Sequence, residues 1–163
     1  MGKLVKKAGI IGKKDVLTNF RFEMLPRQAP WFKDKVLSLE SFERFDLMSS
    51  LKRLSSRINL DQNAFRKAAT KGTKIRILTE KPLPNSFVTP IINGLRKHPN
   101  IKIRFLRSFR DVILTIMDGK EVALALTPKD RVGPPYLVSD HPSYVVIAQQ
   151  FFEVEWEKAS DSQ

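Results

Sequence analysis

The stretch DVILTIMDGKEVALAL at residues 111–126 predicts a β-hairpin. Two apolar runs flank Asp118 and Gly119, a residue pair that readily adopts the positive φ angles of a tight hairpin turn. In the first run, both alternating sets of side chains are largely apolar. A strand that is apolar on both faces lies in the middle of a sheet covered by helices, so this stretch predicts an α/β fold.

The remaining apolar patterns alternate between strands and helices. Further strands are predicted at residues 35–40, 74–79, 101–106 and 136–139. Helices are predicted at residues 47–58 with Asp46 as N-cap, at residues 62–71 with Asp61 as N-cap and Gly72 as the stop, after Thr89, and after Asp140. Helical connections imply parallel strand pairs, and the hairpin adds an antiparallel one. We therefore expect a mixed, mainly parallel sheet with helices on both faces.

The length and composition favour one domain with an appendage. A chain of 163 residues with 42% hydrophobic content can bury its own core. Residues 1–34 are rich in lysine early and in aromatic residues later, so we assign them to a basic N-terminal arm. The domain is expected to cover residues 35–159, and residues 160–163 are expected to form a frayed tail.

Several classes of site and location are disfavoured by what the sequence lacks. There is no cysteine, there are only two histidines, and no phosphate-cradling or dinucleotide-binding glycine motif occurs. We therefore expect no metal site and no cofactor. No apolar run approaches the ~18 residues of a membrane span, so we expect a cytoplasmic protein without membrane contact.

The net charge of +12 is unevenly distributed. Residues 1–34, 35–110 and 111–163 carry net charges of +5, +12 and −5. A chain that is basic over its first two thirds attracts polyanions, including DNA, RNA and anionic surfaces. A solvated basic surface that serves solubility explains the charge equally well. The lysines of the arm are nucleic-acid-binding candidates, against the alternative of an ordinary terminus: Lys3, Lys6, Lys7, Lys13 and Lys14.

An anion-binding or ligand-binding pocket is a second candidate site. Glu40 and Glu80 lie near the ends of predicted strands, where α/β sheets offer a crevice. Arg104, Arg107 and Arg110 crowd one strand and its exit, and arginine binds phosphate or carboxylate through two parallel hydrogen bonds. The alternative is that these side chains face solvent or pair with the acidic C-terminal helix.

Three stretches together resemble the phospholipase D-like effector domain of archaeal TrmB-like transcriptional regulators. They are FRKAATKGTKIRILTE at 65–80, DVILTIMDGKEVALAL at 111–126 and YLVSDHPSYVVIAQQFFEVEWEKA at 136–159. The resemblance runs from about residue 35 to residue 159, and it implies a phospholipase D-like fold. It also implies a homodimer, with the aromatic residues of positions 20–34 in the interface.

The chain departs from this family at two places. Catalytic relatives carry His-x-Lys-x4-Asp on the strand that leads into the hairpin, with the histidine as nucleophile and the lysine holding phosphate. Aligning the aspartate on Asp118 places Asp111 and Ile113 at the histidine and lysine positions, and no His-x-Lys occurs in the chain. The 34 residues before the domain are also too few for the helix-turn-helix that the regulators carry.

These departures imply a regulatory domain that is not an enzyme. The resemblance suggests transcriptional regulation by ligand sensing or dimerisation, with DNA or a DNA-binding protein as partner and a small anionic or sugar ligand. A basic nucleic-acid-binding protein is the alternative, and a phosphodiesterase or nuclease of another mechanism is a third hypothesis.

Overall fold

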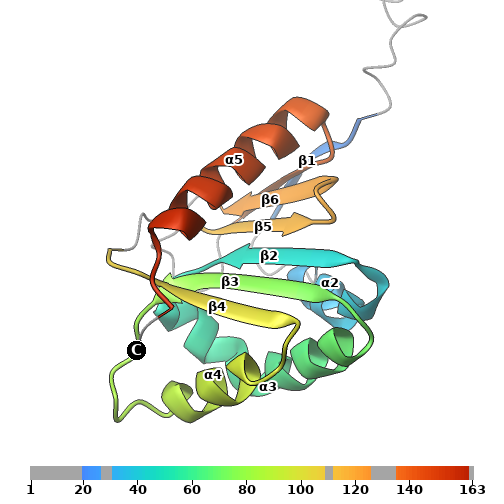
Figure 1. Ribbon diagram of the computed structural model, residues 1–163. Coiled ribbons are helices and arrows are strands. Elements are labelled where there is room, and N and C mark those ends of the chain that lie inside the picture. Colours follow the sequence, from blue (N-terminus) through green and yellow to red (C-terminus); the bar gives the residue numbers. More distant parts are fainter. Residues whose placement is uncertain (1–19, 27–30, 109–111, 126–134, 162–163) are drawn as a thin grey trace, which may run out of the picture.

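A seven-stranded sheet lies between two layers of helices in the computed structural model, which describes residues 20–26, 31–108, 112–125 and 135–161. The helices α3 and α4 cover one face, together with the short helix α2, and the single helix α5 crosses the other (Figure 1). The predicted α/β class with helices on both faces is therefore confirmed.

The strands follow the order β1-β7-β6-β5-β2-β3-β4 across the sheet. Their bounds are β1 Phe22–Leu25, β2 Arg44–Met48, β3 Lys74–Glu80, β4 Ile101–Leu106, β5 Leu114–Met117, β6 Glu121–Ala125 and β7 Tyr136–Ser139. The predicted strands that correspond to β3, β4 and β7 are confirmed, and so is the hairpin of β5 and β6. Asp118 and Gly119 have φ angles of 54° and 63° in its turn.

The prediction of a mainly parallel sheet is wrong. Among the described strands, β2–β3 and β3–β4 are parallel, and every other neighbouring pair is antiparallel. The reason is that the helices α3 and α4 connect only β2, β3 and β4, whereas β5 and β6 are joined by the tight turn at Asp118 and Gly119. We call the end of the sheet where β2, β3 and β4 terminate its carboxyl end, and the end where they begin its amino end.

The second strand lies later in the chain than its pattern predicted. Residues 35–40 do not form a strand, because α2 covers Trp31–Leu37 and a 3-10 turn, η2, covers Leu39–Ser41. Asp46 is not an N-cap but the central residue of β2. Val36 and Leu39 are three residues apart, a spacing that suits a helical turn better than a strand, and they pack into the core from α2 and η2.

The two helices predicted at 47–58 and 62–71 are one helix, α3, covering Leu51–Thr70. Ser50 is its N-cap, and the Ser50 hydroxyl accepts a hydrogen bond from the Arg53 backbone N–H at 3.3 Å. Asp61 is not a cap, since it lies within the helix and is ion-paired with Arg57 at 3.0 Å, one turn earlier. Gly72, with φ at 109°, follows the helix as predicted.

Two segments of the stretch predicted as an N-terminal arm belong to the fold. β1 pairs with β7 and forms one border of the sheet, and α2 packs beside α3. Residues 1–19 lie outside the described part of the chain. The folded unit therefore includes residues that precede the predicted boundary at residue 35.

The two remaining helices are α4, covering Val88–Arg96, and α5, covering Pro142–Lys158. The N-cap of α5 is His141, not Asp140, because the His141 Nδ1 atom accepts a hydrogen bond from the Ser143 backbone N–H at 3.2 Å. Asp140 instead accepts from the backbone N–H of Arg21. Ser160, predicted to fray, is held against β4 by two backbone hydrogen bonds with Phe105.

Two apolar cores fill the spaces on either side of the sheet. The core under α2, α3 and α4 includes Phe45, Ile58, Phe65, Ile77 and Ile103, and the core under α5 includes Met48, Leu78, Ile116, Phe152 and Trp156. Every residue of β5 is buried, which confirms that the first hairpin strand is covered on both faces. The residues on β2 and β3 that alternate with the first core point towards α5, and these residues include Asp46 and Arg76.

Candidate functional site at the carboxyl end of the sheet

The two positions that align with the catalytic histidine and lysine, Asp111 and Ile113, come directly before β5 in the chain. β5 starts at the carboxyl end of the sheet, because Leu114 pairs with Met48, the last residue of β2. Asp111 lies outside the described residues. Ile113 is only 2% exposed, and its carbonyl accepts a hydrogen bond from the Ala125 N–H at 2.9 Å. An apolar, buried side chain at this position cannot hold a phosphate group.

Both histidines of the chain lie at the opposite end. His98 follows α4, whose end precedes the start of β4, and His141 precedes α5, directly after the end of β7. Both positions are at the amino end of the sheet, because β7 runs antiparallel to β6 and finishes there. Neither imidazole can therefore reach a reacting group placed at the carboxyl end.

The two glutamates of the predicted pocket are not brought together. Glu80 ends β3 at the carboxyl end, and its Oε2 atom accepts a hydrogen bond from the Leu51 N–H, so it caps the first turn of α3. Glu40 lies in η2 at the amino end, paired with Lys71 at 2.8 Å and Lys67 at 3.0 Å. These contacts lower the pKa of Glu40 below its usual value, with the hydrogen bond to Lys71 as the main cause.

The predicted arginines have different environments. Arg104 lies 4.7 Å from the Trp156 ring centre, donates to the Trp156 carbonyl at 3.0 Å and pairs with Asp161 at 3.0 Å. Arg104 is therefore engaged by the end of the C-terminal helix and the residue Asp161 beyond it, as the alternative interpretation predicts. Arg107 is exposed just beyond β4. Arg110 and the five arm lysines, Lys3, Lys6, Lys7, Lys13 and Lys14, lie outside the described residues.

Arg53 is a further cation at the carboxyl end, which the sequence did not single out. Its Nη2 atom donates to the Tyr136 hydroxyl, and its guanidinium lies 5.7 Å from that ring centre. Its Nη1 atom is buried without a hydrogen-bond acceptor. Burial raises the pKa of the Tyr136 hydroxyl, against the opposing effect of the Arg53 and Arg57 charges.

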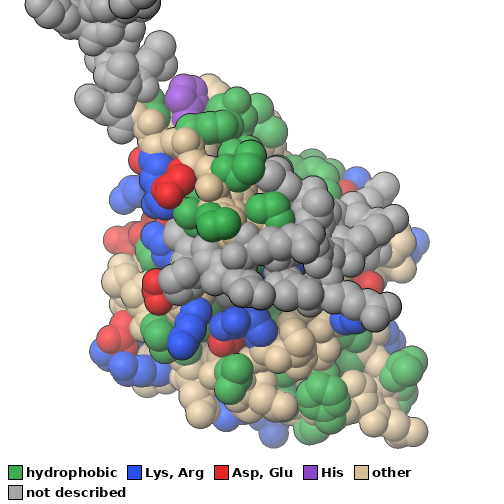
Figure 2. Space-filling model, turned by 180° about the vertical axis from the view of Figure 1, so that it is seen from behind, with side chains coloured by type: hydrophobic (Ala, Val, Ile, Leu, Met, Phe, Trp, Pro, Cys, Tyr) green, Lys and Arg blue, Asp and Glu red, His purple; other side chains and the backbone are tan. Residues whose placement is uncertain are grey.

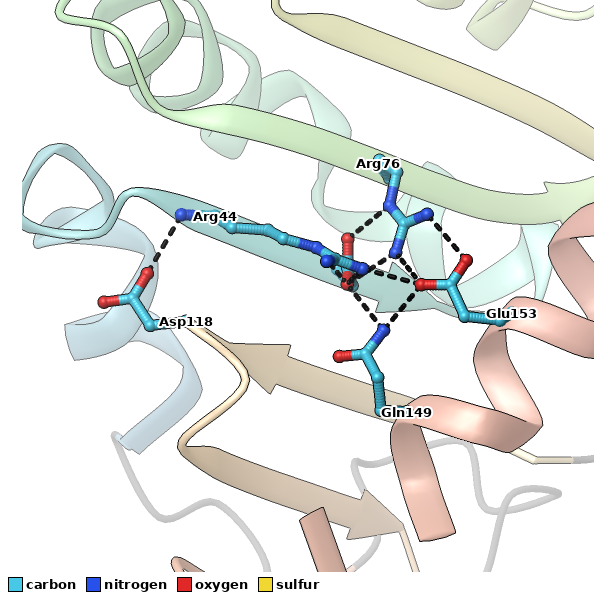
Figure 3. Close-up of polar contacts among 6 residues, drawn as sticks. Arg44, Arg76, Asp118, Gln149 and Glu153 are labelled. Atoms are coloured by element: carbon cyan, nitrogen blue, oxygen red, sulfur yellow. Dashed lines mark hydrogen bonds and ion pairs between the residues drawn. The ribbon is translucent and has the colours of Figure 1, made fainter. Parts of the chain in front are cut away.

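Asp118, which aligns with the aspartate of the His-x-Lys-x4-Asp motif, has a structural role at the amino end of the sheet. Its Oδ1 atom accepts hydrogen bonds from the backbone N–H groups of Glu43 and Arg44, each at 2.9 Å. Its own N–H donates to the Arg44 carbonyl at 2.9 Å. The hairpin turn is thereby attached to the start of β2 (Figure 3). The expectation that Asp118 serves backbone geometry is confirmed, and the structure adds this second anchoring role.

A charged cluster lies between the sheet and α5, where Arg44, Arg76, Gln149 and Glu153 point towards one another (Figure 3). Its fifth member is Asp46, which contacts both arginines and Gln149. Arg76 contacts Asp46 at 2.7 Å and Glu153 at 2.7 Å. Arg44 contacts the same two carboxylates, each at 2.8 Å. Gln149, one turn before Glu153 on α5, donates a hydrogen bond to the Glu153 carboxylate at 2.8 Å. Two cations and two carboxylates balance, so the cluster closes on itself and leaves no free charge for a ligand.

Asp46 is the least accessible member of the charged cluster, with 1% of its surface exposed. Desolvation by burial raises its pKa to about 6, although the charge of Arg44 and the Gln149 hydrogen bond act in the opposite direction. Arg76 also lies over the Phe152 and Trp156 rings, 4.8 and 5.0 Å from their centres. The cluster therefore fixes α5 on the sheet by charge and by aromatic contact.

An apolar groove of about 300 Å³ lies between α5 and the antiparallel half of the sheet. Its walls include Leu114, Leu124 and Leu137 from the strands and Tyr144, Ile147 and Phe151 from α5. Exposed apolar side chains continue this surface, including Phe22 at 58%, Met24 at 64% and Ile147 at 64% exposure. Phe22 touches Tyr144, with ring centres 5.3 Å apart, so β1 and α5 share one apolar surface.

On the face opposite to that of Figure 1, hydrophobic side chains gather near the top, and Lys and Arg side chains lie along the left side and over the lower part among other side chains (Figure 2). Within the described ranges, no group of three His, Cys, Asp or Glu side chains could hold a metal ion. A search of the same residues finds no helix with the length and apolarity to cross a membrane.

Sequence reasoning missed the charged cluster because Asp46 resembled a helix cap. The available signal was the polar pair Arg44 and Asp46 within an otherwise apolar run, matched by Lys74 and Arg76 on a confirmed strand. The apolar groove was also missed. Its signal is the run YVVIA at 144–148, which is apolar on every side of α5 and leaves no polar face for water.

Comparison with known proteins identifies the fold. No protein-family model matches the chain, and no curated protein matches it in sequence. Among solved structures, TrmBL2, an archaeal chromatin protein with a novel mode of DNA binding, is 21% identical with a TM-score of 0.66. The match covers 99% of this chain but only 61% of TrmBL2.

Two phospholipase D-like structures match over nearly their whole length. NucT from Helicobacter pylori is 17% identical with a TM-score of 0.63, over 86% of this chain and 98% of its own. The phospholipase D family member Nuc from Salmonella typhimurium is 12% identical with a TM-score of 0.63, over 89% of this chain and 99% of its own. The fold of this chain is therefore phospholipase D-like.

Proposed function

We propose that this chain is a non-catalytic phospholipase D-like domain that acts in transcriptional regulation through dimerisation and association with DNA. The observation that carries this proposal is the environment before β5. Ile113 is buried where the catalytic relatives need lysine, and both imidazoles lie at the amino end of the sheet. A phosphohistidine intermediate requires a histidine beside the scissile phosphate, and this geometry supplies none.

Dimerisation is favoured over the sensing of a small ligand. Glu80 caps α3, Arg104 pairs with Asp161, and Glu40 is at the other end of the sheet, so these pocket candidates are already engaged within the chain. The apolar groove and the exposed side chains beside it, by contrast, have no cover among the described residues. A two-fold dimer brings one patch against its own copy, and this patch offers both a groove and protruding apolar groups.

Association with DNA is supported by the charge and by the structural match. The chain carries a net charge of +12, and TrmBL2, which is similar over 99% of this chain, is a chromatin protein that binds DNA. Direct nucleic-acid binding through the chain's own basic surface is thus part of the proposal. Its signature is a steep loss of affinity as the salt concentration rises.

An assay of phosphodiester cleavage tests the non-catalytic part. The purified protein is incubated with bis(p-nitrophenyl) phosphate and with plasmid DNA, with and without a chelator, beside an active phosphodiesterase as positive control. We expect no turnover above that of buffer. Turnover that survives the chelator and disappears in Asp118→Asn would establish a nuclease of another mechanism and refute the proposal.

A further inference from the structure

A cluster of exposed cations lies at the amino end of β3 and β4. We call this cluster the basic corner, and its members are Arg66, Lys71, Lys74, Lys97 and Lys102. They come from the end of α3, the start of β3, the end of α4 and the start of β4. All five are exposed. Lys71 is paired with Glu40 at 2.8 Å, so the charges available to a partner are those of the other four.

Hydrogen bonds between distant segments bring the basic corner together. The Asn100 side chain donates to the Ala69 carbonyl at 2.9 Å, which joins the connection after α4 to the end of α3. The Ile75 N–H donates to the Asn100 carbonyl at 2.8 Å. Ile75 and Ile101 are register partners on parallel strands and are both buried. Lys74 and Lys102 flank these partners, so both project from the opposite sheet face, and Arg76 is the register partner of Lys102. The basic corner therefore wraps around the border of the sheet at β4, with Lys74 and Lys102 on the face of α5 and the other three cations on the side of α3 and α4.

Arg66 joins the basic corner across helix α4. A Cβ atom built on Gly94 would lie only 3.1 Å from the Arg66 Nη2 atom, so the missing side chain leaves room for the guanidinium. Lys97 is three residues beyond Gly94, on the same side of the helix. The two cations are thus neighbours, although they belong to different helices.

Within the described residues, the acidic side chains neutralise one member of the basic corner, Lys71, and leave the other four cations. Glu40 reaches Lys71 and Lys67, and Glu43 is exposed next to β2. Other carboxylates are engaged elsewhere, as Glu153 is with Arg44 and Arg76, and Asp161 with Arg104. Within the described part of the chain, no carboxylate forms a salt bridge with Arg66, Lys74, Lys97 or Lys102.

We infer that the basic corner binds the phosphodiester backbone of duplex DNA. The inference rests on the proposed association with DNA and assigns it to a definite surface. Duplex DNA carries about one charge per 1.7 Å of axis, so several exposed cations at one corner of the domain can contact successive phosphates and release their counterions. The corner is at the end of the sheet opposite to the carboxyl end, so this binding uses none of the positions that phospholipase D-like catalysis requires.

Fluorescence anisotropy with a labelled duplex of mixed sequence tests the inference on the full chain. The test variant is Lys74→Gln, Lys97→Gln and Lys102→Gln combined. Its control, Lys52→Gln, Lys81→Gln and Arg107→Gln combined, removes equal charge from exposed positions at the carboxyl end. We expect the corner variant to bind at least 10-fold more weakly at 100 mM salt, and the control less than 3-fold.

The salt dependence gives a second readout. The slope of log affinity against log salt should fall by about 2 to 3 in the corner variant, at ~0.9 per lost phosphate contact, and should stay near the wild-type value in the control. Circular dichroism should be unchanged in both, because every substituted side chain is exposed.

Four outcomes overturn the inference and separate it from the proposed function. If the wild type binds DNA and the two variants lose affinity equally, the basic corner is not the binding surface, although the protein still associates with DNA. Loss of binding only when Lys3, Lys6, Lys7, Lys13 and Lys14 are changed to Gln assigns the contact to those residues instead. Tighter binding to duplex RNA of the same sequence reassigns the corner to RNA. Absence of wild-type binding at 50 mM salt removes both the corner and direct association with DNA.

Discussion

Arg76 donates two hydrogen bonds to the Asp46 carboxylate, from Nε at 2.7 Å and from Nη2 at 2.9 Å. The two residues are register partners on the parallel strands β2 and β3, so this forked pair joins the strands beneath α5. The same guanidinium reaches Glu153 and the Phe152 ring on the helix. Arg76 therefore links β2, β3 and α5 through one guanidinium group.

Replacing Arg76 should destabilise the domain strongly. Arg76→Met keeps the apolar stem but leaves Asp46 and Glu153 facing each other with Arg44 alone. Removal of one partner from a buried ion pair costs about 3 kcal/mol in the free energy of unfolding. Denaturant unfolding measures the loss. Lys74→Met, two residues earlier on the same face, is the control, and it should change stability by less than about 0.5 kcal/mol.

Protonation of Asp46 should stabilise the fold as the pH falls. The pKa of Asp46 is raised to about 6 from 3.8, so the folded state binds this proton more tightly than the unfolded state does. This stabilisation is complete below the unfolded pKa and is lost as the pH rises through about 6. Between pH 7 and pH 5, the wild type should gain about 1 kcal/mol more in unfolding free energy than Asp46→Asn. Identical pH profiles in the two proteins would contradict this assignment.

Asp118 should be required for stability and not for chemistry. Asp118→Ala removes the acceptor for the Glu43 and Arg44 N–H groups and places a less tolerant residue at positive φ. We expect a loss of about 2 kcal/mol from the two effects together. Asp118→Asn keeps a side-chain oxygen and tolerates positive φ, so thermal unfolding should show a smaller loss. A larger loss for Asn than for Ala would mean that the carboxylate charge matters more than the hydrogen bonds.

The apolar groove should govern self-association. Light scattering after size exclusion should give the wild type about twice the chain mass of 18.7 kDa. Ile147→Glu places a charge in the centre of the patch and should yield the monomer, because burying an unpaired carboxylate is costly. Leu60→Glu, at an exposed position on α3, should leave the dimer intact. A wild-type monomer at high protein concentration would refute dimerisation through this surface.

The sequence predicts those elements of the fold whose signals are local. The strands β3, β4 and β7 and the hairpin are bounded by their own alternation and turn residues, and they were placed correctly. The pattern does not predict β2, because its central Asp46 is made tolerable by hydrogen bonds from Arg76 and Gln149, which are remote in sequence. The pattern predicts Asp61 as a helix cap, because its pairing with Arg57 inside one long helix is not visible in the composition of the segment.

The one feature of the candidate site that the sequence predicts is the absence of the catalytic histidine and lysine. The missing His-x-Lys is a property of the sequence, and the structure adds that Ile113 is buried. The prediction that Glu40 and Glu80 share one crevice does not hold, because it requires a strand at residues 35–40. The chain forms a helix and a turn there. The basic corner could not be predicted, since its members become neighbours only when α3 and α4 both return to the amino end of the sheet.

The pairing of β1 with β7 also bears on the order of folding. Phe22 pairs with Ser139, so β1 has no partner during synthesis until β7, far behind it in the sequence, has been made. Contacts of such long sequence separation form late and slow the overall reaction. During that interval Phe22 and Met24 are unpaired while the lysine-rich residues before them remain charged. We therefore expect the emerging chain to depend on this positive charge to stay dispersed until β7 is available.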